Sequence, residues 1–149
     1  MNPFDLKSAL LAKHAQHVVL IHFPIALFLV AVMFDFVARL LRKPALTVVA
    51  YYNLIVAAFM SVPVLGTGVL AWRWQLQAAP LQGLLLQHMV LGFLSAVLIW
   101  IAWWFHRLAA GKPETQVPAY CLVLESVGAC VVALTAHLGG FLSGVSLSG

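Results

Sequence analysis

Histidine is the residue type in this 149-residue chain that best supports chemistry, and two of the six histidines stand at the start of a long apolar run. They are His17 and His22, in the apolar stretch HVVLIHFPIAL, which runs from His17 to Leu27. A neutral imidazole is a good ligand for iron, copper and zinc, but it is costly to bury among apolar groups without a partner. The stretch therefore indicates a ligand or hydrogen-bond site at the start of a long apolar segment.

The composition indicates a membrane protein. Hydrophobic residues make up 64% of the chain and charged residues 8%, whereas a soluble domain carries about 25% charged residues. The mean hydropathy is +1.03. We identify no secretory signal, because the first apolar run is too long and no small-residue cleavage site follows it. Neither Cys121 nor Cys130 lies in a heme-attachment motif, and on one helix they would be too far apart for a disulfide.

Four apolar stretches are long enough to cross a bilayer as helices, which takes about 20 residues each. They cover residues 18–41, 46–74, 84–106 and 118–142. Short connections favour antiparallel neighbours, and the tryptophans near the span ends are typical of interfacial belts. The sequence predicts a single domain, residues 1–149, that is an all-α integral membrane protein with an antiparallel up-down bundle of four transmembrane helices.

Basic residues predict the orientation of this bundle. One side of the membrane would carry Lys7, Lys13 and Arg73, and the opposite side would carry Arg39, Arg42, Lys43, Arg107 and Lys112. Because basic loops stay in the cytoplasm, the first and third connections should face the cytoplasm. We expect a multi-pass protein of the bacterial inner membrane with both termini in the periplasm.

This topology gathers the histidines near the outer, periplasmic face. His14, His17 and His22 lie at the start of the first span, His88 near the start of the third, and His137 near the end of the fourth. Imidazoles converging from three helices favour a heme or metal site over a hydrogen-bonded polar cluster, which is the alternative. The predicted ligands are His17, His22, His88 and His137, for heme or for a metal ion.

Heme suits this layer better than a bare ion. Histidines on different helices can supply both axial ligands, and the apolar macrocycle belongs inside an apolar bundle. Small residues at or near the same depth would make room for it, namely Gly66, Gly68, Gly92, Gly139 and Gly140. Taken alone, these glycines favour close helix packing over a heme pocket.

His17 and His22 are five residues apart, about 140° around an ideal helix, so they share a face only if Pro24 bends the helix. We therefore expect them to serve two sites, or one to ligate while the other only hydrogen-bonds.

A second polar group is predicted near the cytoplasmic side. Asp35, Arg39, His106 and Glu125 lie at similar depth, and Asp35 and Arg39 have the i, i+4 spacing of an ion pair. We interpret this group as a structural ion-pair layer. A proton path and a quinone headgroup pocket are the alternatives.

Several motifs resemble a bacterial family of membrane proteins, domain-of-unknown-function family 2231. The matching segments are His17 to Leu27, Gly66-Thr67-Gly68 with Trp72, His88, and His137 to Leu142. The chain departs from many relatives at Val18, where they have proline, and at Ala71, where they have an acid. The resemblance covers nearly the whole chain and implies the four-helix fold. Some members are joined to cytochrome-like domains, which implies a redox role.

The leading hypothesis is a membrane electron-transfer subunit with one or two b-type hemes near the outer face. His22, His88 and His137 are the first ligand candidates and His17 is the next. Electrons would pass between quinone, or a larger respiratory complex, and a periplasmic cytochrome c. The alternatives are a protein that binds or transports copper, zinc or iron through the same histidines, and a cofactor-free structural subunit.

No catalytic residue set is predicted. The sequence contains no nucleophile with an oriented base, no phosphate loop and no zinc-protease motif, so we do not expect a stand-alone enzyme, although a role as an oxidoreductase subunit stays open. The eight basic residues are scattered over loops, a pattern that does not indicate a nucleic-acid partner. The lipid bilayer is the expected environment.

Overall fold

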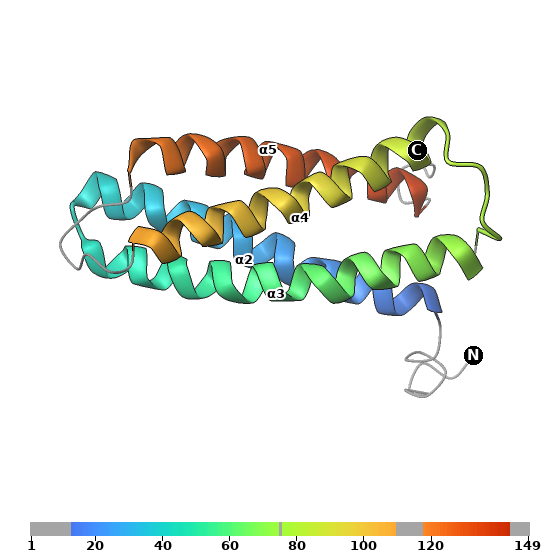
Figure 1. Ribbon diagram of the computed structural model, residues 1–149, viewed down its shortest axis with the longest axis horizontal. Coiled ribbons are helices and arrows are strands. Elements are labelled where there is room, and N and C mark those ends of the chain that lie inside the picture. Colours follow the sequence, from blue (N-terminus) through green and yellow to red (C-terminus); the bar gives the residue numbers. More distant parts are fainter. Residues whose placement is uncertain (1–12, 75, 110–117, 144–149) are drawn as a thin grey trace.

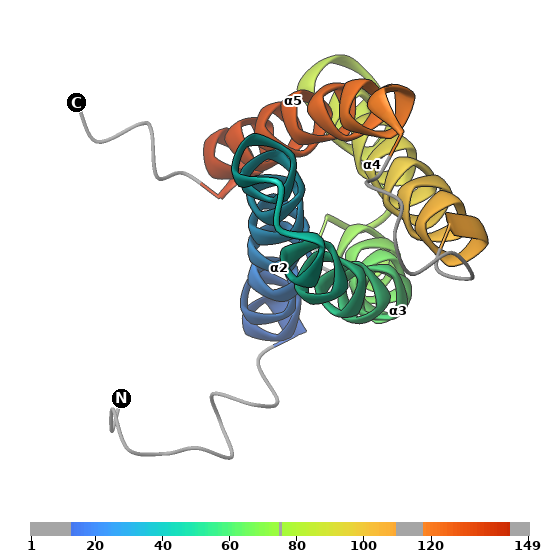
Figure 2. The ribbon, with the colours of Figure 1, turned by 90° about the vertical axis from the view of Figure 1, so that its left-hand side faces the viewer.

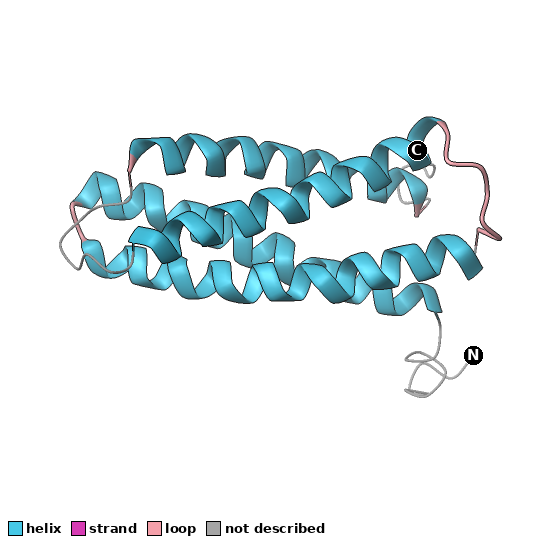
Figure 3. Ribbon diagram, in the orientation of Figure 1, coloured by secondary structure: helices cyan, strands magenta, loops and turns pink. Residues whose placement is uncertain are grey.

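A computed structural model of the chain describes residues 13–74, 76–109 and 118–143. Within these ranges the secondary structure is helical, without strands (Figures 1 and 3). The helices are α2 (Lys13–Leu41), α3 (Pro44–Trp74), α4 (Gly83–Ala109) and α5 (Ala119–Leu142). All four are long and apolar enough to span a membrane. The predicted all-α membrane fold is thus confirmed.

The predicted spans and the observed helices differ by only a few residues. The largest difference is at α2, which begins at Lys13 rather than at Val18. Hydropathy marks where the apolar core of the bilayer would begin, whereas a helix can continue beyond it into the headgroup region. Lys7 and Lys112, used in the orientation argument, lie outside the described residues.

The helices form a bundle in which each packs mainly on two neighbours. α2 packs on α3, α3 on α4, α4 on α5, and α5 on α2, as the view along the bundle in Figure 2 illustrates. The most extensive contacts are those of α2 with α3 and of α4 with α5, and these two pairs are called the hairpins below. The start of α2 and the end of α5 lie at one end of the bundle, and the α2–α3 connection at the other (Figure 1).

The connection between α2 and α3 is a tight turn with a defined cause. Arg42 has a positive φ of 52°, and the Lys43 amide donates to the Ala38 carbonyl at 2.9 Å. This is the hydrogen bond of a Schellman motif, which closes the end of α2. Pro44 then starts α3, where its missing amide hydrogen costs nothing.

Buried residues are confined to one half of the bundle's length. We call residues 24–41, 44–61, 95–109 and 119–132 the closed half, and residues 16–23, 62–74, 83–94 and 133–142 the open half. All buried residues among those whose exposure is described belong to the closed half. The closed half lies toward the α2–α3 turn, and the open half lies toward the start of α2.

The core of the closed half is built largely from small residues. The buried cluster contains Ala31, Ala50, Ala57, Ala58 and Ala102, with Phe28 and Leu54 as its largest fully buried apolar side chains. Small side chains let helix backbones approach closely, which is how helices associate when lipid is as apolar as the helix surface.

Large apolar side chains cover the outside of the bundle. Leu40 is 81% exposed, Val123 65% and Tyr52 62%, and many other leucines, valines and phenylalanines are similarly exposed. Water would penalise such a surface, whereas lipid chains cover it at no cost. The structure therefore agrees with a bilayer environment.

Candidate functional site

His88 is held against α5 in the open half. This half-buried residue of α4 donates from Nδ1 to the Thr135 carbonyl oxygen, at 3.1 Å. Because a carbonyl only accepts, the proton must be on Nδ1, which leaves the lone pair on Nε2. The ring also lies over Gly139, where an added Cβ would be 3.0 Å from the His88 Cε1. The imidazole is therefore fixed in tautomer and in position.

His17 makes the corresponding contact in the other hairpin. Its Nδ1 lies 3.1 Å from the Thr67 hydroxyl oxygen on α3. The Thr67 hydroxyl already donates to the Pro63 carbonyl at 2.9 Å, with the Val64 carbonyl 3.0 Å away, so the imidazole must be the donor in the His17 contact. A Cβ added at Gly68 would be 3.0 Å from the His17 Cε1. Each hairpin thus places a histidine between a threonine and a glycine of the next helix.

His22 and His137 take other directions. His22 is exposed, and its Nδ1 donates to the Val18 carbonyl of its own helix at 2.7 Å. His137 is exposed too, and its ring meets Phe141 edge-on with the centroids 4.8 Å apart. α2 continues as one helix through Pro24, and His17 and His22 have different partners, as their spacing predicts.

The structure does not gather the predicted ligands into one compact group. In the described part of the chain, no three of His17, His22, His88 and His137 bring ring nitrogens within 4.8 Å of one another. The side chain of His14 lies outside the described residues.

The predicted glycines fall into two groups. Gly68 lies beneath a histidine ring, as does Gly139, whereas a Cβ added at Gly66 or Gly140 would meet nothing within 4 Å. Gly92 is intermediate, since its added Cβ would be in ordinary contact, 3.9 Å from the Thr135 Cγ2. Two of the five glycines therefore have a contact that a larger residue would disturb.

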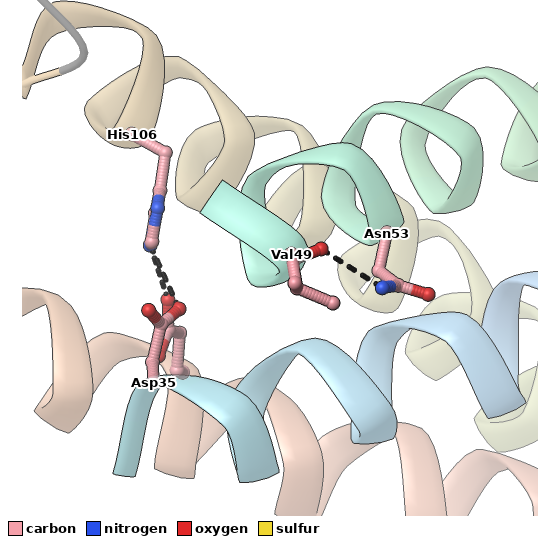
Figure 4. Close-up of polar contacts among 5 residues, drawn as sticks. Asp35, Val49, Asn53 and His106 are labelled. Carbon is pink, nitrogen blue, oxygen red and sulfur yellow. Dashed lines mark hydrogen bonds and ion pairs between the residues drawn. The ribbon is translucent and has the colours of Figure 1, made fainter. Parts of the chain in front are cut away.

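The closed half contains a second polar site, which we call the acid–histidine cluster: Asp35 of α2, His106 of α4 and Glu125 of α5. The His106 Nε2 lies 2.7 Å from the Glu125 Oε1 and 3.2 Å from the Asp35 Oδ2. All three residues are buried. Figure 4 shows His106 and Asp35 pointing toward one another from separate helices. The predicted layer of similar depth is therefore a direct contact among three helices.

The expected pairing of Asp35 with Arg39 is wrong. Both Asp35 carboxylate oxygens lack a hydrogen-bond partner, and the ionic contact of Asp35 is with His106. Arg39 is exposed. The i, i+4 spacing still leaves about 40° of rotation between two side chains, so Asp35 faces the bundle interior while Arg39 lies on the surface.

Three carboxylate oxygens of this cluster have no hydrogen-bond donor. They are Oδ1 and Oδ2 of Asp35 and Oε2 of Glu125. The single hydrogen on the His106 Nε2 is donated to the Glu125 Oε1. The side-chain amide of Asn53 donates to the Val49 carbonyl of its own helix, at 2.9 Å (Figure 4). The acids therefore outnumber the donors that reach them.

An apolar groove of about 470 Å³ lies on the outside of the bundle between α3 and α4, and Phe93, Trp100, Trp103 and Trp104 contribute to its lining. The indole of Trp100 donates to the Ser61 hydroxyl at 3.2 Å, whereas the buried Nε1 of Trp103 has no hydrogen-bond partner. The groove therefore has flat aromatic walls.

The threonine partners of the histidines were not predicted as site residues. Thr67 lies within the quoted Gly66-Thr67-Gly68 motif, so a signal was present for one of them. The acceptor that Thr135 provides is its backbone carbonyl. Every residue has such a carbonyl, so the residue type could not indicate this contact.

Four membrane-length helices, an apolar exterior and polar groups held between helices define a multi-pass α-helical membrane protein. The model of the family described as "Predicted membrane protein (DUF2231)" matches residues 13–145. The chain belongs to this family, as the sequence motifs predict. No curated protein and no solved structure matches the chain.

Proposed function

We propose that the chain is a membrane electron-transfer subunit that binds b-type heme in the open half. The observation that best supports this is the anchoring of His88. Histidines that ligate metals commonly donate their second ring hydrogen to a carbonyl or carboxylate, which fixes the tautomer and raises the basicity of the ligating nitrogen. The His88 Nδ1 donates to a backbone carbonyl in this way, and Nε2 carries the lone pair that an iron would use.

His17 is the second axial ligand in this proposal. It belongs to the opposite hairpin and lies between a threonine hydroxyl and a glycine, whereas His88 lies between a threonine backbone carbonyl and a glycine. A porphyrin between the two hairpins would have one imidazole on each face, the arrangement of a bis-histidine b-type cytochrome. No residue of the open half whose exposure is described is buried, and an apolar macrocycle would cover part of this surface. When bound, the heme supplies a one-electron carrier.

One heme is the minimum of the proposal. His22 and His137, both exposed, rank below His17 and His88 as ligands. The sequence alone ranked His17 below the other three histidines. The structure reverses the order of His17 and His22, because His17 hydrogen-bonds to a neighbouring helix whereas His22 bonds only to its own. A second heme would have to recruit the two exposed histidines.

The proposed partners follow from the position of the site. With both termini in the periplasm of a bacterial inner membrane, as the basic loops favour, the open half faces a periplasmic cytochrome c. Quinone or a larger respiratory complex would act as the other redox partner. The aromatic groove between α3 and α4 would suit a quinone ring.

Optical spectroscopy on the full chain, purified from cells supplied with heme precursor, tests this proposal. We expect a Soret band, a pyridine hemochrome of b-type heme, and about one heme per chain. His88→Ala and His17→Ala should lose the heme, whereas the matched control His22→Ala should keep it. An intact chain with no Soret band and no hemochrome overturns the proposal.

The alternatives give other results in the same preparation. Near-stoichiometric copper, zinc or iron without porphyrin, lost when His17, His22, His88 and His137 are all replaced, would establish histidine-based metal handling instead. Normal assembly of that fourfold variant with an unchanged spectrum would establish a structural subunit. Either result contradicts the heme proposal.

A further inference from the structure

We propose that the acid–histidine cluster is a binding site for one divalent cation of the first transition row, such as Mn²⁺, Fe²⁺ or Zn²⁺. The ligands would be the Nε2 of His106 and one carboxylate oxygen each from Asp35 and Glu125. This site is separate from the histidines of the open half and does not depend on heme being bound there.

The ligand atoms already converge on one point. All three lie within 4.8 Å of one another, with His106 Nε2 at 2.7 Å from the Glu125 oxygen and 3.2 Å from the Asp35 oxygen. Ligands about 2.0–2.2 Å from a tetrahedral zinc are roughly 3.3 Å from each other. The Asp35 separation already fits this value, and the Glu125 carboxylate needs to move back by only a fraction of an ångström.

The charge of the cluster matches a divalent cation. Two ionised carboxylates beside a neutral imidazole would sum to −2. Protons on one acid and on the imidazole, or one divalent cation, would remove this charge. A net charge is expensive inside a buried, lipid-surrounded bundle unless it is neutralised. A divalent cation makes the sum zero, while His106 gives up its Nε2 proton and presents a lone pair.

The unpaired oxygens are a second, independent observation. Asp35 is 1% exposed and Glu125 is fully buried, yet three of their four carboxylate oxygens have no hydrogen-bond donor. About nine in ten buried polar groups in native proteins have a partner. Three unpaired oxygens at one place call for a proton shared between the acids or for a further group, and a cation is a group that bonds to oxygen without itself needing an acceptor.

The surrounding side chains do not supply this neutralisation. The amide of Asn53 is used within its own helix. Arg107 belongs to the same end of the bundle but is exposed. His106 lies three residues before the end of α4, about 4.5 Å of helix rise, so a cation has a short path from this end of the helix.

The ligand set limits the kind of ion. One imidazole nitrogen with two carboxylate oxygens suits borderline to hard divalent metals, and it is a poor match for Cu⁺, which prefers sulfur ligands. Cys121 is buried one turn before Glu125 on the same helix, yet it is not part of the converging group. Three protein ligands leave coordination positions open for water or another small ligand.

Metal binding by the full chain in detergent tests the proposal. The protein would be stripped with a chelator, equilibrated with Zn²⁺ or Mn²⁺, and assayed for metal per chain by mass spectrometry and for Mn²⁺ by electron paramagnetic resonance. We expect one ion per chain. Asp35→Asn and Glu125→Gln should each weaken binding by more than about 100-fold, because losing a ligand costs more than losing an outer-shell contact, which costs about 10–100-fold.

Two control variants make the result specific. Asn53→Ala removes a nearby amide that does not reach the acids and should leave binding unchanged. The fourfold replacement of His17, His22, His88 and His137 by alanine should also keep the ion, whatever it does to heme. Helicity by circular dichroism and elution as a single species would verify the fold of each variant.

Clear outcomes overturn the proposal. A stripped wild-type chain that binds neither Zn²⁺ nor Mn²⁺ excludes the site without any variant. Metal retained in both Asp35→Asn and Glu125→Gln but lost in the fourfold histidine variant would assign the ion to the open half. Heme absent but metal retained at the cluster would overturn the proposed function and leave this site standing.

Discussion

The closed and open halves of the bundle use the same four helices in different ways. In the closed half, side chains join the two hairpins: His106 contacts Asp35 across α4 and α2, and Phe28 of α2 lies against Gly128 of α5. In the open half, the His17 contact joins α2 to α3 and the His88 contact joins α4 to α5. The closed half therefore holds the hairpins together, and the open half keeps each histidine within its own hairpin.

This difference indicates which part of a membrane bundle can hold a ligand-binding site. A core of alanines with few large side chains brings helices close and leaves little space for a ligand larger than an ion. Histidines held by one hydrogen bond and one glycine contact are fixed without being enclosed. We infer that the closed half gives the molecule its shape, and that this lets the open half stay accessible to a cofactor.

The largest expected effect comes from the core of the closed half. Phe28→Ala removes a fully buried ring and should lower the free energy of unfolding by about 3–5 kcal/mol. Its matched control is Phe23→Ala on the same helix, at a side chain that is 51% exposed. Unfolding in detergent, followed by circular dichroism, measures both. Equal losses of unfolding free energy in the two variants would contradict the division of the bundle into a closed and an open half.

A smaller loss is expected where the hairpins meet. A Cβ added at Gly128 would be 2.9 Å from the Phe28 Cζ, so Gly128→Ala should destabilise the bundle by about 1–3 kcal/mol through overpacking. Gly66→Ala is the control, because its new methyl group would meet nothing within 4 Å. The same unfolding assay applies. If Gly128→Ala is as stable as wild type, the contact between α2 and α5 is looser than described.

In the open half, glycine substitutions should change binding more than stability. Gly139→Ala places a methyl group 3.0 Å from the His88 Cε1, so the ring must shift and heme content should fall. Gly140→Ala on the same helix has open space around its Cβ and should retain the heme. Hemochrome content per chain measures this, and identical losses in both variants would argue against His88 as a ligand.

The smallest effect should come from the hydroxyl beside His17. Thr67→Val removes the acceptor of the imidazole hydrogen and should lower the free energy of unfolding by about 0.6 kcal/mol, the average for side-chain hydrogen bonds between membrane helices. Thr135→Val leaves the His88 bond in place, because the backbone carbonyl is the acceptor there. A shift of the heme spectrum in Thr67→Val alone would sharpen the assignment of His17.

Sequence alone predicted the four spans well, because hydropathy over about 20 residues reports directly on the bilayer. It also placed Asp35, His106 and Glu125 at one depth, and the structure brings them into contact. It could not predict which way each helix faces. Helices that are apolar all round give no stripe from which to read the buried face, so His22 and His137 were ranked above His17. The Asp35–Arg39 pairing failed for the same reason, because spacing along a helix does not say which side meets its neighbours.

The tight turn at Arg42 has a consequence for how the chain assembles. Only Arg42 and Lys43 separate α2 from α3, so closing this loop costs little chain entropy, whereas the α3–α4 and α4–α5 connections are longer. α2 and α3 also leave the ribosome before α4 and α5. We expect them to pair during insertion into the membrane and to form a template on which α4 and α5 then dock, with the pairing of Asp35 and His106 among the late steps.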